Sequence, residues 1–227
     1  MDLRTGIFFL WTFVLIGWPQ DIFQSLQVAR PALVLGIMTL ILIVLVPTRG
    51  AVAEAFQSPE GRKYVLLYLI MIVGIPFAYH KRVAFEYTFL TYEVNVLYFI
   101  ACVLIVDSVA KLSGLLFVMV AAACWYGVVG LAEGVHSDGR LFMVGSGHDP
   151  NDLAFVLIAL FPASAYFIVR PTGLLARLFA GASLVASLGV ILLSGSRGGL
   201  LGLAAVILAF ILTGKGRVQR AISSYWP

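Results

Sequence analysis

The chain has 227 residues, of which 61% are hydrophobic and only 11% charged, and its formal net charge is +4. A soluble domain is usually about half apolar and about a quarter charged, so this composition excludes an ordinary soluble globular protein. The hydrophobic residues form long blocks, which indicates an integral membrane protein. Membrane proteins collect Lys and Arg at their cytoplasmic ends, so the positive charge does not require a nucleic-acid partner, and we expect none.

Apolar segments follow one another along the chain and predict an all-α, polytopic transmembrane helix bundle of about eight spans. Only helices are expected, because a backbone in lipid must satisfy its hydrogen bonds within the segment, and the alternation typical of a β-barrel is absent. We expect residues 1–227 to form a single transmembrane helical domain whose first span is retained, since no cleavage pattern follows it. The segments are residues 5–19, 31–47, 64–79, 89–107, 115–131, 152–169, 175–193 and 199–213.

The distribution of basic residues predicts the orientation of these spans. With the N-terminus in the cytoplasm, ten of the 15 Lys and Arg residues lie on the inner side, as the positive-inside rule requires. The other five lie on the outer side, where this rule does not favour them, so each invites a functional explanation. These five are Arg30, Lys81, Arg82, Arg140 and Arg197.

The longest outer loop leads into the sixth segment through "GSGHDPNDLAF", residues 145–155. Asp149 before Pro150 is a good N-cap, and an acidic Asp152 in the first turn suits the helix dipole. Helix capping does not account for His148 or Asn151, so the four polar residues are together a candidate loop motif. For His148 we expect a loop-structuring or substrate-contacting role and not that of a general base.

A second polar cluster ends the seventh segment in "LLSGSRGGLLGL", residues 192–203. Arg197 lies there among small residues that include Ser196 and Gly198. Glycines let backbone N–H groups approach a ligand, and arginine holds a phosphate with a planar fork. A tight turn whose arginine snorkels to the lipid headgroups is the structural alternative. Both clusters are predicted on the outer face, where Lys81, Arg82 and Arg140 would add cations for a phosphate-bearing substrate.

The motifs "GSGHDPNDLAFVLIALFP" and "ILLSGSRGGLLGL", in this order, resemble those of the O-antigen ligase and O-antigen polymerase family of bacterial inner-membrane proteins. The resemblance implies a glycosyltransferase that transfers or polymerises undecaprenyl-diphosphate-linked glycan, for O-antigen or exopolysaccharide, at the outer face of the inner membrane. Its acceptor would be a glycan or lipid A–core sugar, and neither a cofactor nor a metal is expected. Arg197 matches the arginine of the family's SRGG turn, and Arg140 matches by loop position.

The chain departs from this family in one respect. Family members carry a large outer loop late in the chain, and that loop holds the histidine proposed as general base. No such loop occurs in residues 1–227, so we expect an N-terminal portion of a longer protein and assign no catalytic residue.

Two other function classes stay open at the level of the sequence. The first is a transporter of a small anion such as bicarbonate, for which ionisable residues within the membrane would be expected. Only Glu93 and Asp107 qualify, and both fall near the ends of the fourth segment. The second is a non-catalytic, truncated remnant that acts as a scaffold.

Overall fold

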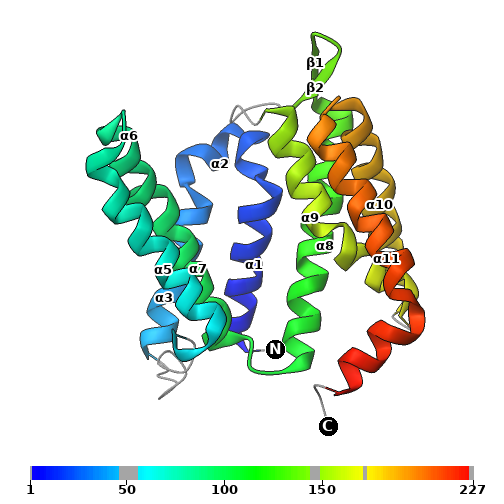
Figure 1. Cartoon of the computed structure of the whole chain (residues 1–227), viewed down its shortest axis with the longest axis horizontal. Coiled ribbons are helices and arrows are strands. Elements are labelled where there is room, and N and C mark those ends of the chain that lie inside the picture. Colours follow the sequence, from blue (N-terminus) through cyan, green and yellow to red (C-terminus); the bar gives the residue numbers. More distant parts are fainter. Residues whose placement is uncertain (1, 46–55, 144–148, 171–172, 225–227) are drawn as a thin grey trace. The chain divides into compact units, whose positions relative to one another are not determined.

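The structure is a computed structural model that describes residues 2–45, 56–143, 149–170 and 173–224. The described chain consists of α-helices joined by short connections, with one two-stranded β-hairpin (Figure 1). It divides into two compact units. The first comprises Met1–Trp11 and Pro31–Leu115, and the second comprises Thr12–Arg30 and Leu116–Pro227.

The first unit is built from helices that are packed partly through aromatic rings. Tyr64 of helix α5 stacks on Tyr92 and Phe99 of α7, with ring centroids 5.9 and 4.8 Å apart. Helix α5 ends at Gly74, just before a short 3-10 turn that contains Pro76. The elements here are the first part of α1 (Leu3–Gly17), α3 (Pro31–Leu45), α5 (Pro59–Gly74), η2 (Ile75–Phe77), α6 (Lys81–Glu86), the π-helical turn η3 (Tyr87–Thr91), α7 (Tyr92–Ile105) and the start of α8 (Val109–Glu133).

The second unit holds the rest of α1 and α8, then three further long helices. A buried cluster unites α8, α9 and α10, because Tyr126, Leu157 and Ile191 are all fully or almost fully enclosed in one core. The remaining elements are η1 (Pro19–Asp21), α2 (Gln24–Ala29), β1 (Val135–Ser137), β2 (Arg140–Phe142), α9 (Pro150–Val169), α10 (Leu174–Leu193) and α11 (Arg197–Ser224).

Small residues allow these helices to approach closely, as is common between membrane helices. A Cβ atom placed on Gly127 of α8 would lie 2.9 Å from the Cβ of Ala186 on α10, so only glycine fits there without a shift. The hydroxyls of Ser164 on α9 and Ser183 on α10 form a buried hydrogen bond of 3.0 Å. Together the contacts fix α10 against both α8 and α9.

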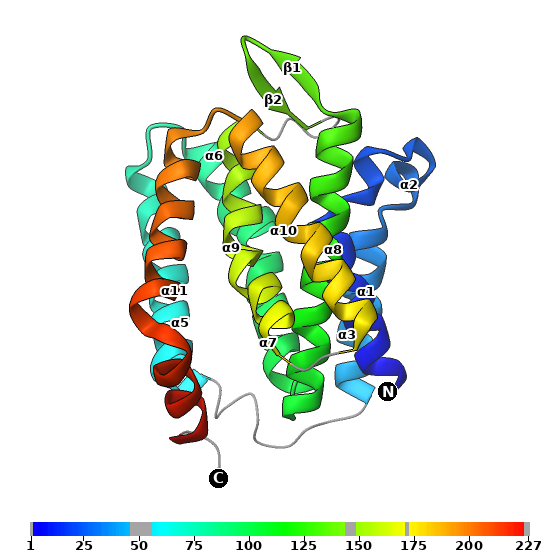
Figure 2. The same cartoon turned by 90° about the vertical axis from the view of Figure 1, so that its right-hand side faces the viewer.

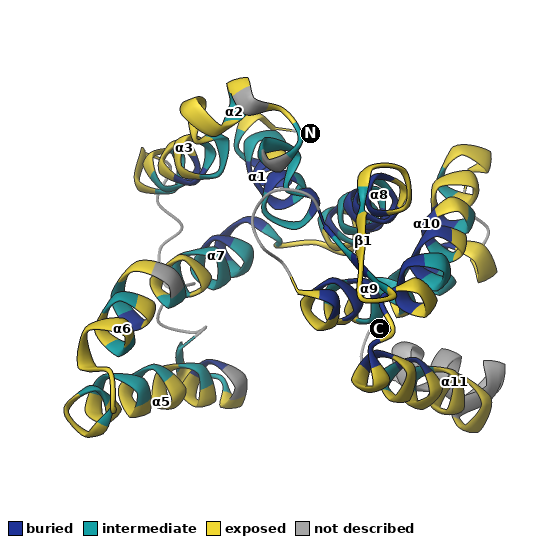
Figure 3. Cartoon of the chain, turned by 90° about the horizontal axis from the view of Figure 1, so that it is seen from above, coloured by how far each residue is buried: buried dark blue, intermediate teal, exposed yellow. Residues whose placement is uncertain are grey.

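Large apolar side chains remain exposed on the helices, which is the pattern expected where lipid covers the surface. Phe155, Val185 and Leu201, for example, are 73%, 72% and 74% exposed, and one face of α10 and of residues 197–212 of α11 is exposed (Figure 3). Among the described residues, five helices are long and apolar enough to span a membrane: Ser25–Leu45, Lys81–Ile105, Val109–Glu133, Pro150–Val169 and Leu174–Leu193. Leu3–Gly17 and Arg197–Leu212 are shorter apolar helices. The predictions of an all-α fold and of a multi-pass membrane protein are confirmed.

One end of the second unit gathers several chain segments that are far apart in the sequence. The β1–β2 hairpin, the start of α9, the end of α10 and the start of α11 all lie there (Figure 2). This hairpin is not among the predictions from the sequence, because the expectation of helices concerns only the segments in lipid. Its cause is the dipeptide Asp138–Gly139, whose φ angles of 51° and 72° form the two-residue turn that this pair favours between antiparallel strands.

Candidate functional site

The turn between α10 and α11 forms one wall of the candidate site. Gly195 follows the end of α10 with φ +60°, a left-handed conformation that glycine adopts at the ends of helices without strain. Ser196 then caps α11, because its Oγ accepts a hydrogen bond of 3.1 Å from the N–H of Gly199. Buried Ser194 stabilises the turn through its Oγ, which donates to the carbonyl of Ile191 at 2.8 Å.

Arg140 reaches this turn from the hairpin. It is paired with Ser137 across the Asp138–Gly139 turn, which places it at the start of β2. Its Nε donates a hydrogen bond of 2.9 Å to the carbonyl oxygen of Ser194, one of the carbonyls that the end of α10 leaves unpaired. Just before the hairpin, the N–H of Gly134 donates a hydrogen bond of 3.2 Å to the carbonyl oxygen of Gly130, and a Cβ at Gly134 would overlap that oxygen. The hairpin therefore holds a cation against the end of α10.

The start of α9 forms the other wall. Asp149 caps this helix, and its Oδ1 accepts hydrogen bonds from the backbone N–H groups of Asn151 at 2.6 Å and Asp152 at 3.0 Å. The pKa of Asp149 lies below its usual range, chiefly because of the hydrogen bond from the N–H of Asp152 and next because of that from Asn151. The positive charge of Arg140 lowers this pKa further. Asn151 points the oxygen of its amide at Arg140, whose Nη2 donates to it at 3.2 Å.

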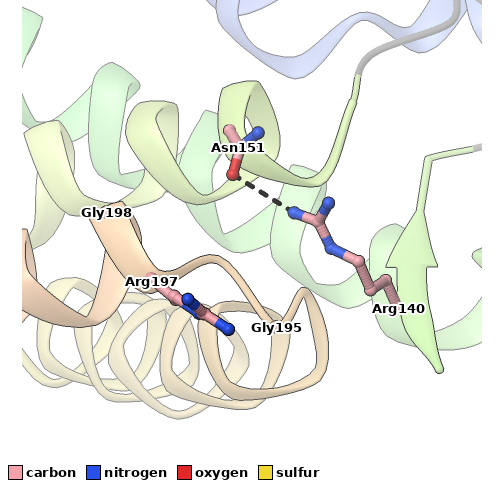
Figure 4. A pocket seen from close by; sticks show the side chains of 5 residues that line it. All are labelled: Arg140, Asn151, Gly195, Arg197 and Gly198. Carbon is pink, nitrogen blue, oxygen red and sulfur yellow. Dashed lines mark hydrogen bonds between the residues drawn. The ribbon is translucent and has the colours of Figure 1, made fainter.

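An open pocket of about 390 Å³ lies between these walls. Its lining residues are Arg140, Asn151, Gly195, Arg197 and Gly198, and Figure 4 shows Arg140 directed at Asn151 across it. All five belong to the second unit. Two guanidinium groups and two glycines in one open pocket have the chemistry to bind an anion, because they combine positive charge with close access to the backbone.

Arg197 is one of the two cations of the pocket. Its guanidinium forms no hydrogen bond or ion pair with another described residue. Arg197 is exposed and begins α11, so its charge lies at the positive end of the helix dipole. A cation there is unfavourable, whereas an anion would be stabilised by both the dipole and the guanidinium. The position therefore suits anion binding better than it suits the stability of the helix.

The structure brings together residues from both predicted polar clusters. Arg140, Asn151, Ser196, Arg197 and Gly198 surround or line the pocket, and Asp149 and Asp152 lie at the start of α9 beside it. His148 lies outside the described residues. Lys81 and Arg82 begin α6 in the first unit, where the Nε of Arg82 forms an exposed ion pair of 2.8 Å with Oε1 of Glu86.

Sequence reasoning missed two features on which the site depends. The first is the hairpin that delivers Arg140, which the Asp-Gly pair in "HSDGR" could have indicated. The second is the close approach of α11 to α9, where a Cβ on Gly199 would lie 2.8 Å from the Cβ of Ala154. No local pattern signals this contact, because it depends on a residue 45 positions earlier in the chain.

The cap of α9 leads to a prediction about pH. We expect Asp149→Asn to keep the cap, since an asparagine oxygen also accepts N–H bonds, but to remove its charge. A depressed folded-state pKa contributes stability that is present above the unfolded-state pKa, about 3.9, and is lost as the pH falls through the folded-state value. The wild-type melting temperature should therefore exceed that of the variant near neutral pH, and the difference should shrink below about pH 4. Melting curves of the purified chain across this range measure it, and a difference independent of pH would contradict the assignment.

The site is thus defined by its own geometry: two arginines delivered by different segments, a neutral amide hydrogen-bonded to Arg140, and a glycine-rich turn. It has the chemistry of an anion-binding pocket at one end of a group of apolar helices. Comparisons of the chain with protein-family models, with curated proteins and with solved structures found no match.

Proposed function

We propose that the chain is a membrane glycosyltransferase-like protein that binds the diphosphate of an undecaprenyl-diphosphate-linked glycan and takes part in its transfer or polymerisation. The observation that carries this proposal is the pair of Arg140 and Arg197, which line one open pocket from two different segments. The likeness of the two sequence motifs to the O-antigen ligase and polymerase family supports the choice of reaction. The acceptor would be a growing glycan or a lipid A–core sugar.

The composition of the pocket favours a diphosphate on a lipid over a free small anion. Each guanidinium offers a planar fork of donors, and two forks match the two phosphate groups of a diphosphate. The pocket also lies at the end of helices whose exposed surface is apolar, so a ligand with a hydrocarbon tail reaches it from the membrane. A small soluble anion would make no use of that surface.

The charges of the second unit support placing the pocket on the outer side of the membrane. The resemblance adds to this proposal a bacterial inner membrane, and the count of basic residues along the sequence adds a cytoplasmic N-terminus. Arg170 ends α9 and Arg177 lies in the first turns of α10, at the ends of these helices away from the pocket. Lys215, Arg217 and Arg220 follow in the last part of α11. By the positive-inside rule, this more basic end is the cytoplasmic one.

In the proposed reaction, an acceptor hydroxyl oxygen forms a bond to the anomeric carbon of the donor sugar. The bond from that carbon to the diphosphate breaks, and the polyprenyl diphosphate leaves with the electron pair. Arg140 and Arg197 would stabilise the negative charge that develops on this leaving group. The five residues that line the pocket include no general base, so the proton of the acceptor hydroxyl must go to a group outside this set.

The proposal is tested by binding to the full chain in lipid nanodiscs. We expect a polyprenyl diphosphate to bind at least about tenfold more tightly than the polyprenyl monophosphate of equal chain length, because it makes more charge-assisted hydrogen bonds with the two arginines. The free polyprenol is the control for insertion of the tail into the membrane. Equal affinity for the three lipids would show that only the tail is recognised and would contradict the proposal.

A further inference from the structure

Asn151 forms a side-chain hydrogen bond to Arg140 in the pocket. The two ends of its amide face groups of opposite charge. Its Oδ1 accepts hydrogen bonds from Nη2 of Arg140 at 3.2 Å and from Oγ of Ser196 at 2.8 Å. Its Nδ2 donates to Oδ2 of Asp149 at 3.4 Å. Arginine can only donate and a carboxylate can only accept, so the neighbours determine which way the amide points.

The amide therefore stands between a cation and an anion that would otherwise attract each other. In the described part of the chain, Arg140 forms no ion pair, and the carboxylate of Asp149 is engaged by the N–H groups at the start of α9. A direct pair between the two would turn the guanidinium towards Asp149 and cancel most of its charge. An aspartate at position 151 would also cancel most of the charge of Arg140, since its carboxylate would form an ion pair with the guanidinium. It would in addition repel the carboxylate of Asp149.

We propose that Asn151 is a positioning residue that keeps Arg140 directed at the pocket and separate from Asp149, so that the guanidinium retains its charge for an anionic ligand. This inference rests on the proposed function of the pocket, because it assumes that Arg140 binds a phosphate group. It assigns to the amide a role that neither a carboxylate nor an apolar side chain of similar size can fill.

A purely structural role for Asn151 makes a different prediction. The hydrogen bond to Ser196 also joins the start of α9 to the start of α11, so removal of the amide will affect packing as well. Damage to packing would not be repaired by a second change at Asp149. Competition from Asp149 would be repaired, because Asp149→Asn removes the competing charge and keeps an oxygen that caps α9.

The experiment measures binding of inorganic pyrophosphate to the full chain in nanodiscs by calorimetry. We expect Asn151→Ala to lower the affinity about fivefold and Asn151→Asp at least about tenfold. In the double variant with Asp149→Asn and Asn151→Ala, the affinity should return to within about twofold of the wild type. Asp149→Asn alone should not lower the affinity. Melting temperatures of the two Asn151 single variants report on packing, and that of the double variant is compared with Asp149→Asn alone.

The outcomes separate this inference from the proposed function. Weaker pyrophosphate binding by Arg140→Ala would support the anion site. If Asp149→Asn then fails to restore the affinity of the Asn151→Ala variant, the positioning role of Asn151 is overturned, but the anion site is not. An Asn151→Asp variant that binds as well as the wild type overturns the positioning role too. If the wild-type chain does not bind pyrophosphate, or Arg140→Ala leaves its affinity unchanged, the proposed function of the pocket fails and the inference fails with it.

Discussion

Replacement of Arg197 by alanine is expected to lower the affinity of the chain for a lipid-linked diphosphate by about 10- to 100-fold, which corresponds to the loss of one or two hydrogen bonds to a charged group. The large effect follows from the position of this side chain. Arg197 has no partner among the described residues and lines the pocket at the start of α11, so its removal costs the protein no internal bond. The melting temperature should therefore stay the same or rise slightly, since a cation is unfavourable at this end of the helix.

A matched control is available on the same unit. Arg177 lies near the start of α10, roughly 24 Å along the helix axis from its other end at Leu193, where the chain turns towards the pocket. Arg177→Ala removes the same charge and should leave binding unchanged. In cells, the Arg197→Ala variant should stay in the membrane but lose glycan transfer, and glycan ladders equal to those of the wild type would remove Arg197 from the proposed mechanism.

Gly199→Ala is expected to lower the stability of the protein through the contact between α11 and α9. An alanine Cβ there would lie 2.8 Å from the Cβ of Ala154 and 3.2 Å from both the Cβ and the Oγ of Ser196. Overpacking of this kind costs about 1–3 kcal/mol, against a gain of about 1 kcal/mol from replacing a helical glycine. The net loss of up to about 2 kcal/mol corresponds to a melting temperature lower by up to roughly 8 °C for a chain of this length.

Gly202→Ala is the control for this prediction, because it makes the same change one turn further along α11. The nearest atoms to its Cβ would be those of Ile158 at 3.5 Å, an ordinary contact, so its melting temperature should be unchanged or higher. A second variant tests the cause directly: adding Ala154→Gly removes the opposing methyl group, so Gly199→Ala should destabilise the Ala154→Gly protein less than it destabilises the wild type. Equal melting temperatures for Gly199→Ala and Gly202→Ala would contradict the close packing of α9 and α11.

Hydrophobic blocks are sufficient to predict the long helices, because a membrane-spanning helix requires a long apolar segment and no particular sequence motif. Each of the eight predicted segments overlaps a helix, although the boundaries differ by several residues. The segment predicted at residues 64–79 begins five residues earlier in the structure, at Pro59, where Ser58 caps α5. The segment predicted at 89–107 extends back to Lys81 and contains the π-helical turn, which hydropathy does not register.

For the site, the sequence predicts the residue types and puts both polar clusters on one face, where they could share a site if the last three spans are neighbours. It does not predict the contact that joins the SRGG turn to the start of α9, the hydrogen bond between Ser196 and Asn151. For Arg140 the sequence indicates only a position in a loop, since the hairpin that orients it requires pairing between residues on both sides of the turn. Long-range contacts of this kind depend on the packing of α8, α9 and α10 and leave no periodic pattern in the sequence.

The tip of the hairpin offers a way to observe the pocket without altering it. Gly139 itself is unsuitable for a label, because its φ of +72° would strain any side chain. Ser137 is exposed and is paired with Arg140 in the hairpin, so a small fluorophore attached through Ser137→Cys would lie beside a pocket residue and sense the occupancy of the pocket. Its accessibility to a membrane-impermeant quencher would also report which compartment the hairpin faces.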